Sequence, residues 1–163
     1  MPDSVFLPAA DIPSFVGKGN VDLGITGHDV ILEAEMQQHV SETLKLEFGR
    51  CALQVQVPES GSIRTVEDLA GKRIVTSFEV LAKEYFGKLD DQLQLVGENR
   101  TRIEYVGGSV ETACALGLAD GIGEFVFFPL PWCFSRMMSL VEQRASRSRW
   151  YVCNNCVLRF PRC

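Results

Sequence analysis

The 163-residue sequence predicts an α/β protein whose parallel or mixed sheets are covered by helices on both faces. Strand patterns alternate with helical patterns through residue 124. Two of these strands follow each other directly, and such a break is where a two-lobed α/β chain crosses between its lobes. The content of 46% hydrophobic and 23% charged residues is typical of a globular protein. No apolar run is long enough for a membrane span, so we expect a cytoplasmic protein without membrane contact.

The first half of the chain carries two strand and helix pairs followed by two strands. Alternating apolar side chains indicate the strands, and a wider apolar spacing indicates the helices. Asp11 is placed to cap the first helix, and Pro13 fits its first turn. The predicted elements are a strand at 5–7, a helix that stops at Gly17 or Gly19, a strand at 21–26, a helix at 29–36, and strands at 44–48 and 52–57. We place a hinge near residues 49–51.

The second half continues the alternation. Thr65 and Asp68 have the spacing of a capping box, which predicts a short helix closed by Gly71. Ser109 is placed to cap a later helix that Gly117 ends. The remaining predicted elements are a strand at 72–76, a helix at 79–86, a strand at 103–106 and a strand that follows residues 118–122.

Small or hydroxylated residues recur where the predicted strands end. The turns are Thr26-Gly27, Thr76-Ser77 and residues 107–109. Glycines at 24 and 27 would let a ligand approach the backbone, and free amides at a helix start attract anions. Each turn alone is most often an ordinary connection. Because open α/β sheets bind ligands outside the carboxyl ends of their strands, the three turns together predict a small-anion cleft between lobes.

Charge and motif patterns exclude several function classes. Residues 1–124 carry 10 Lys and Arg against 20 Asp and Glu, a charge of −10. This acidity argues against a nucleic-acid partner, which requires clustered cations. The sequence has neither a Walker phosphate loop nor the third glycine of a dinucleotide fingerprint.

Few residues are suited to nucleophilic or metal chemistry. His39 lies in a polar stretch typical of the surface, whereas His28 either faces a ligand or simply opens a helix. Cys153 and Cys156 have the spacing of half a zinc site without a second pair, so we expect no metal site. The remaining candidates are carboxylates near the turns, which suit ribose hydroxyls or a hydrated cation. They are Asp22, Glu111, Asp120 and Glu124.

Several runs of residues closely resemble the ATP phosphoribosyltransferase family, which catalyses the first step of histidine biosynthesis. The order and spacing of the runs match the fungal form over about residues 5–124. The runs are ADIP (10–13), GNVDLGITGHD (19–29), GKRIVTS (71–77), GSVE (108–111) and GLAD (117–120).

The resemblance implies a two-lobed fold like that of type II periplasmic binding proteins. It also implies a cleft for ATP and phosphoribosyl pyrophosphate, in which N1 of adenine displaces pyrophosphate from the ribose, with Mg²⁺ on the pyrophosphate. Such a transfer depends on positioning and charge neutralisation rather than on a nucleophilic side chain. The intact family is expected to form homo-oligomers.

Site residues follow from the same resemblance. Asp120 and Glu124 match the acidic pair before the ribose-phosphate loop and are the expected catalytic residues, although the family prefers Asp where this chain has Glu124. The expected substrate-binding or nucleotide-binding residues are Asp22, Leu23, Gly24, Thr26, Gly27, Thr76, Ser77, Ser109 and Glu111.

The sequence also departs from the family pattern. The family opens with a cation-bearing segment upstream of the first match, and it continues after the acidic pair into a Gly-Thr phosphate loop, where this chain has residues 125–129. Residues 125–163 carry six Arg and one Glu. We therefore expect a partial first lobe (1–50), a partial second lobe (51–124) and a non-homologous, irregular tail (125–163). The prediction is a fragment with impaired activity. The alternatives are a non-catalytic small-anion module of the same fold and a zinc-dependent interaction protein built on the tail.

Overall fold

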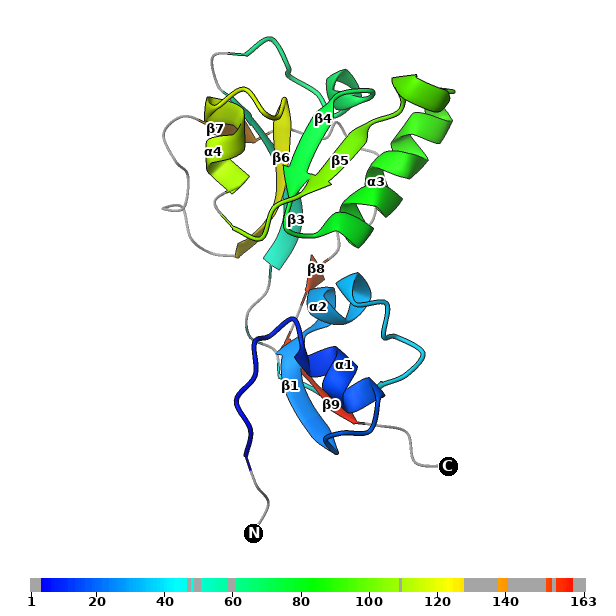
Figure 1. Cartoon of the computed structure of the whole chain (residues 1–163), viewed down its shortest axis with the longest axis vertical. Helices are drawn as coiled ribbons and strands as arrows, with labels where there is room; N and C mark the ends of the chain where they lie inside the picture. The colour runs from blue at the N-terminus through cyan, green and yellow to red at the C-terminus, as the bar shows by residue number, and fades with distance from the viewer. Residues whose placement is uncertain are drawn as a thin grey trace. The chain divides into compact units, whose positions relative to one another are not determined.

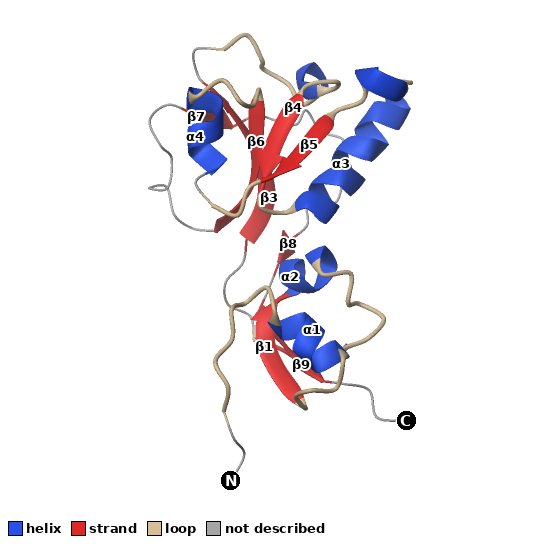
Figure 2. Cartoon of the chain, in the orientation of Figure 1, coloured by secondary structure: helices blue, strands red, loops and turns tan. Residues whose placement is uncertain are grey.

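The computed structural model describes residues 4–46, 48, 51–58, 61–108, 110–127, 138–140, 152, 153 and 155–159. The chain divides into two compact units (Figure 1). The first comprises Met1–Cys51 and Tyr151–Cys163, and the second comprises Ala52–Trp150. Both units combine helices with strands (Figure 2). Each is described separately below.

The first unit is built on a small antiparallel sheet with the strand order β1-β9-β2. In register, Leu23 and Ser41 both face Arg159. Val16 and Ile31 form the buried core, and Ile12 together with the loop residues Val21, Met36 and Val40 packs around them. The elements are α1 (Ile12–Gly17), β1 (Leu23–Gly27), α2 (His28–Glu33), β2 (Ser41–Lys45), β8 (Val152–Cys153) and β9 (Asn155–Arg159).

The second unit contains a mixed sheet with the order β5-β4-β6-β3-β7. Strand β4 lies between two parallel neighbours, with Ile74 opposite Ile103 on one side and Gly121 on the other. Strands β3 and β7 pair antiparallel. The elements are β3 (Cys51–Pro58), η1 (Glu67–Leu69), β4 (Arg73–Thr76), α3 (Glu79–Gln92), η2 (Gly97–Asn99), β5 (Arg102–Tyr105), α4 (Val110–Ala115), β6 (Gly121–Phe127) and β7 (Met138–Leu140).

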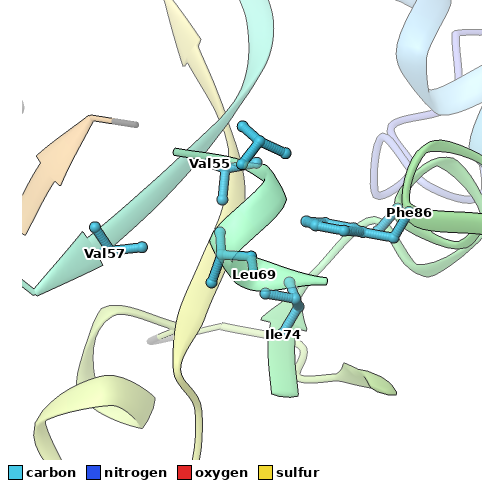
Figure 3. Close-up of a cluster of buried hydrophobic side chains, with 7 residues drawn as sticks. Val55, Val57, Leu69, Ile74 and Phe86 are labelled. Carbon is cyan, nitrogen blue, oxygen red and sulfur yellow. The ribbon is translucent and has the colours of Figure 1, made fainter. Parts of the chain in front are cut away.

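Helices cover both faces of this sheet because successive residues of β4 point in opposite directions. Ile74 packs with Phe86 of α3 and with the η1 segment in one buried cluster (Figure 3). Val75 packs with Val110 of α4 and Ile122 of β6 in another cluster on the other face. A central strand buried on both sides is the hallmark of the α/β class that the sequence predicts.

Several predicted elements differ from those observed. The predicted strand at 5–7 is wrong, because residues 4–8 have no regular secondary structure. Helix α2 ends at Glu33 instead of residue 36, since Glu35 adopts a positive φ of 54°. Helix α3 continues beyond residue 86 to Gln92, and β2 lies at Ser41–Lys45 rather than at 44–48.

Capping and the tail also differ from expectation. Asp11 occupies the position before α1, but its side chain makes no capping hydrogen bond. The short helix after Thr65 is a single 3-10 turn, η1. Where the sequence predicts an irregular tail after residue 124, the described residues include the end of β6 and the strands β7, β8 and β9.

Candidate functional site

Thr76 connects three segments where β4 ends. Its side chain is fully buried. Its hydroxyl donates a hydrogen bond to the carbonyl oxygen of Gly123 at 2.7 Å and accepts one from the backbone N–H of Phe78 at 3.0 Å. These bonds join β4 to β6 and to the residue that precedes α3. Thr76 therefore shapes the turn, and its hydroxyl is already engaged within the protein.

Ser77 and Glu124 meet at the same edge. Because Thr76 lies opposite Gly123 in the parallel ladder, the next residues of the two strands are neighbours. The Ser77 hydroxyl donates to Glu124 Oε1 at 2.8 Å, and both residues are half-buried. A carboxylate and a hydroxyl are thus presented beside the N-terminus of the 14-residue helix α3. The N-terminal backbone amides and dipole of such a helix favour anions.

A second turn of this unit lies at the same edge. The backbone N–H of Val106 donates to the carbonyl oxygen of Thr76 at 3.0 Å, which places the start of the 106–108 turn next to the end of β4. Helix α4 follows this turn, with Glu111 exposed in its first turn. Ser109, the predicted cap, lies outside the described residues. The structure therefore brings together two of the three turns that the sequence singles out.

Asp120 lies at the opposite, amino-terminal edge of the parallel strands. Its Oδ2 accepts hydrogen bonds from the Arg73 backbone N–H at 3.0 Å and from Arg73 Nε at 3.3 Å. Burial raises the pKa of Asp120, but the Arg73 backbone N–H and guanidinium together with the charge of Lys72 outweigh it and hold the pKa below its ordinary value. Asp120 and Glu124 are four residues apart along an extended chain, roughly 13 Å. The structure therefore does not bring this predicted acidic pair together.

The predicted residues of the first unit surround β1. Asp22 is exposed just before the strand, whereas Thr26 is buried at its end and donates to the carbonyl oxygen of Ala9 at 3.3 Å. Gly24 faces helix α1: an added Cβ would lie 2.7 Å from the Ile12 side chain. The absence of a side chain at Gly24 therefore allows α1 to pack closely on β1. Gly27 has an ordinary extended backbone, with a φ of −75°.

Two polar residues beside this turn were missed or left open by sequence reasoning. Asp29 is a buried carboxylate in the first turn of α2, and its position two residues after Gly27 was the available signal. His28 pairs through Nδ1 with Glu42 Oε2 of β2 at 3.4 Å. This contact connects α2 to β2.

Among the residues that the structure describes, no three His, Cys, Asp or Glu side chains gather as a metal site. The side chains of Cys153 and Cys156 lie outside the described residues. Within the described ranges, no helix is long and apolar enough to span a bilayer.

One α/β unit with a small antiparallel sheet and a second with a mixed sheet and polar turns at its carboxyl edge have the fold of the type II periplasmic-binding-protein class. Solved structures with this fold include an ATP phosphoribosyl transferase (HisG:HisZ) complex from Thermotoga maritima, with a TM-score of 0.70 and 21% identity over 95% of this chain and 66% of that chain. Another is Tv2483 bound to L-arginine, with a TM-score of 0.62 and 13% identity over 94% of this chain and 58% of that chain.

The chain belongs to the ATP phosphoribosyltransferase family, whose sequence model matches residues 8–127. It is 52% identical over 130 residues to the ATP phosphoribosyltransferase of Schizosaccharomyces pombe, covering 75% of this chain and 42% of the relative. It is 57% identical over 122 residues to that of Yarrowia lipolytica, covering 75% of this chain and 40% of the relative. The chain thus spans about two fifths of the length of these curated relatives.

Proposed function

We propose that this chain binds phosphoribosyl pyrophosphate and ATP as part of ATP phosphoribosyl transfer, the first step of histidine biosynthesis. The family membership over residues 8–127 supports the reaction class. The observation that carries the location is the Ser77–Glu124 hydrogen bond beside the N-terminus of α3 and the 106–108 turn. This edge offers a carboxylate, a hydroxyl and the positive end of the α3 dipole to a phosphorylated sugar.

The proposed roles follow from the geometry. Glu124 accepts hydrogen bonds from the ribose hydroxyls, and Ser77 orients its carboxylate. Glu111 and Ser109 contribute at the start of α4. Asp120 connects β6 to β4 at the far edge, so we assign it a structural role. On the first unit, the adenine nucleotide contacts residues 22–24, Thr26 and Gly27.

The reaction exchanges two bonds at one carbon. The bond from the anomeric carbon to the pyrophosphate oxygen breaks, and a bond from that carbon to N1 of adenine forms. Mg²⁺ bound to the pyrophosphate supplies neutralisation of the leaving charge. The protein groups orient the ribose for attack, and the helix amides hold phosphate oxygens.

Reduced activity is part of the proposal. The chain covers about two fifths of its relatives, and residues 125–129 replace the Gly-Thr loop expected to hold the ribose phosphate. A non-catalytic anion-binding module of the same fold is therefore the second candidate. We also propose a cytoplasmic location and homo-oligomeric assembly, on the strength of the biosynthetic relatives.

Calorimetry and a pyrophosphate-release assay separate the candidates. Titrating phosphoribosyl pyrophosphate with Mg²⁺ into the chain is expected to give saturable heat, and adding ATP is expected to release pyrophosphate slowly. Ser77→Ala should weaken phosphoribosyl pyrophosphate binding about tenfold, as expected for the loss of one hydrogen bond to a charged group. Ser14→Ala, on α1, is the control and should leave binding unchanged. Binding without release favours the non-catalytic module, and the absence of both refutes both candidates.

A further inference from the structure

Tyr105 is an exposed aromatic residue at the carboxyl edge of the second unit, and the roles proposed so far do not include it. It is the last residue of β5 and lies opposite Thr76 in the parallel ladder. It is 60% exposed, although the strand it ends belongs to the sheet. Adjacent strands lie about 4.8 Å apart, so Tyr105 and Ser77, which follows Thr76, are close enough to contact the same small ligand.

The Tyr105 ring extends along the strand toward the 106–108 turn. A Cβ added at Gly107 would lie 3.4 Å from the Tyr105 hydroxyl and 3.9 Å from the ring carbons Cε1 and Cζ. Because Gly107 comes after the end of β5, the hydroxyl lies past the strand and against the turn. A Cβ added at Gly108 would meet no atom within 4 Å, so the next position of the turn faces open space.

Tyr105 lies on the face of the sheet that α3 covers. Ile103 packs against the buried cluster that contains Phe86 of α3, and alternation along β5 puts Tyr105 on the same face as Ile103. Figure 1 shows α3 running beside β5, and the helix begins at Glu79, just after β4 ends. The Tyr105 hydroxyl is therefore on the side of the edge where α3 begins, at the positive end of the helix dipole.

The Tyr105 hydroxyl has a proton available for a ligand. Two other hydroxyls at this edge donate theirs within the protein, from Thr76 to the Gly123 carbonyl oxygen and from Ser77 to Glu124 Oε1. No hydrogen bond joins the Tyr105 hydroxyl to any residue that the structure describes. A phenol is a neutral donor, and a charged phosphate oxygen accepts a shorter and stronger hydrogen bond than a neutral acceptor does.

We propose that Tyr105 is a further substrate-binding residue, whose hydroxyl donates a hydrogen bond to a phosphate oxygen of the sugar phosphate held beside Ser77 and Glu124. This role depends on the sugar phosphate binding at this edge, as the proposed function states. Glu124 recognises the ribose hydroxyls, and Tyr105 recognises the phosphate that the sugar carries. Together they select a phosphorylated pentose over the free sugar.

Calorimetry of the full chain tests the hydrogen bond. Tyr105→Phe removes the hydroxyl alone and should weaken binding of phosphoribosyl pyrophosphate with Mg²⁺ about tenfold. Tyr85→Phe removes the same group from α3, where Tyr85 packs edge-on against Phe86, and should leave the affinity unchanged. Ribose 5-phosphate locates the bond. A loss of affinity for both ligands assigns it to the 5-phosphate, whereas a loss for phosphoribosyl pyrophosphate alone assigns it to the pyrophosphate.

Fluorine NMR tests the contact directly. The chain has three tyrosines, so labelling with 3-fluorotyrosine gives three resonances, and Tyr105→Phe identifies the one that belongs to Tyr105. Phosphoribosyl pyrophosphate with Mg²⁺ should shift this resonance saturably and leave the Tyr85 resonance in place.

Three results would overturn the role of Tyr105. If Ser77→Ala weakened binding and Tyr105→Phe did not, the sugar-phosphate site would stand without Tyr105. If Tyr105→Phe and Tyr85→Phe weakened binding equally, the loss would reflect the fold rather than a contact. If the unsubstituted chain bound no phosphoribosyl pyrophosphate, the proposed function and the role of Tyr105 would fail together.

Discussion

Thr76 shows how one buried hydroxyl organises the candidate site. It donates to Gly123 and accepts from Phe78, so the end of β4, the third residue of β6 and the residue before α3 are held together. The sequence predicts Thr76 as a ligand contact because it follows a strand. The structure buries Thr76 completely, and its hydrogen bonds support the turn that carries the half-buried Ser77.

Replacing Thr76 with the isosteric valine should lower the free energy of unfolding by about 1–3 kcal/mol, because the Phe78 N–H and the Gly123 carbonyl lose their partner. Chemical denaturation followed by circular dichroism measures the change. Thr76→Ser keeps the hydroxyl and should lose less. Equal losses for the two variants would show that the hydroxyl bonds contribute nothing.

The lowered pKa of Asp120 predicts that the stability of the folded chain depends on pH. Its pKa is lower in the folded chain than its ordinary value, so the carboxylate contributes stability above that ordinary value, about 3.9 for aspartate. This contribution is lost as the pH falls through the folded pKa. The stability difference between the unsubstituted chain and Asp120→Asn should therefore shrink as the pH falls from 5 to below about 3. A difference that stays constant over this range would contradict the role of the ionised group.

At the scale of elements, Gly24 sets the packing of α1 on β1. An added Cβ would lie 2.7 Å from Ile12 Cγ2 and 2.8 Å from Val16 Cγ2, closer than side chains normally approach. Val16 is fully buried in the unit's core. Helix α1 must therefore shift if residue 24 acquires a side chain.

Gly24→Ala should destabilise the chain by about 1–3 kcal/mol, the usual cost of overpacking. Thermal unfolding followed by circular dichroism measures it. Gly108→Ala is the matched control, because no atom lies within 4 Å of an added Cβ there. If the two substitutions changed the melting temperature equally, tight packing at Gly24 would not explain the effect.

Local patterns predicted most elements of the fold because their apolar faces are buried within the same unit. They were wrong at residues 5–7, where the composition favours a strand but no neighbour pairs with it. They also ended α3 too early, at residue 86, whereas the helix continues through Gly87 to Gln92. The insertion of β9 between β1 and β2 joins residues more than 100 positions apart, and no local signal predicts it.

The sequence predicted part of the candidate site. Parallel pairing places Thr76 opposite Gly123, which is why the residues that follow them, Ser77 and Glu124, meet. Asp120 and Glu124 are close in sequence, but an extended strand separates them by about 3.3 Å for each residue. The partner of Asp120 is Arg73, 47 positions away, and no spacing rule indicates it.

At the scale of the whole molecule, this chain of the ATP phosphoribosyltransferase family folds into two α/β units. The second unit brings two polar turns to one edge, at Thr76 and at Val106. That the Thr26–Gly27 turn of the first unit faces the same ligand stays a prediction. The central claim is that the edge with Ser77 and Glu124 binds the phosphorylated sugar.

The most direct test is a ¹H–¹⁵N NMR titration of the chain with phosphoribosyl pyrophosphate and Mg²⁺. The account predicts saturable shifts of the backbone amides of Ser77, Phe78, residues 106–108 and Glu124. The amides of Arg73 and Asp120, at the opposite edge, should stay unchanged and serve as internal controls. Shifts centred on Arg73 and Asp120, or no saturable shift at Ser77 and Glu124, would contradict it.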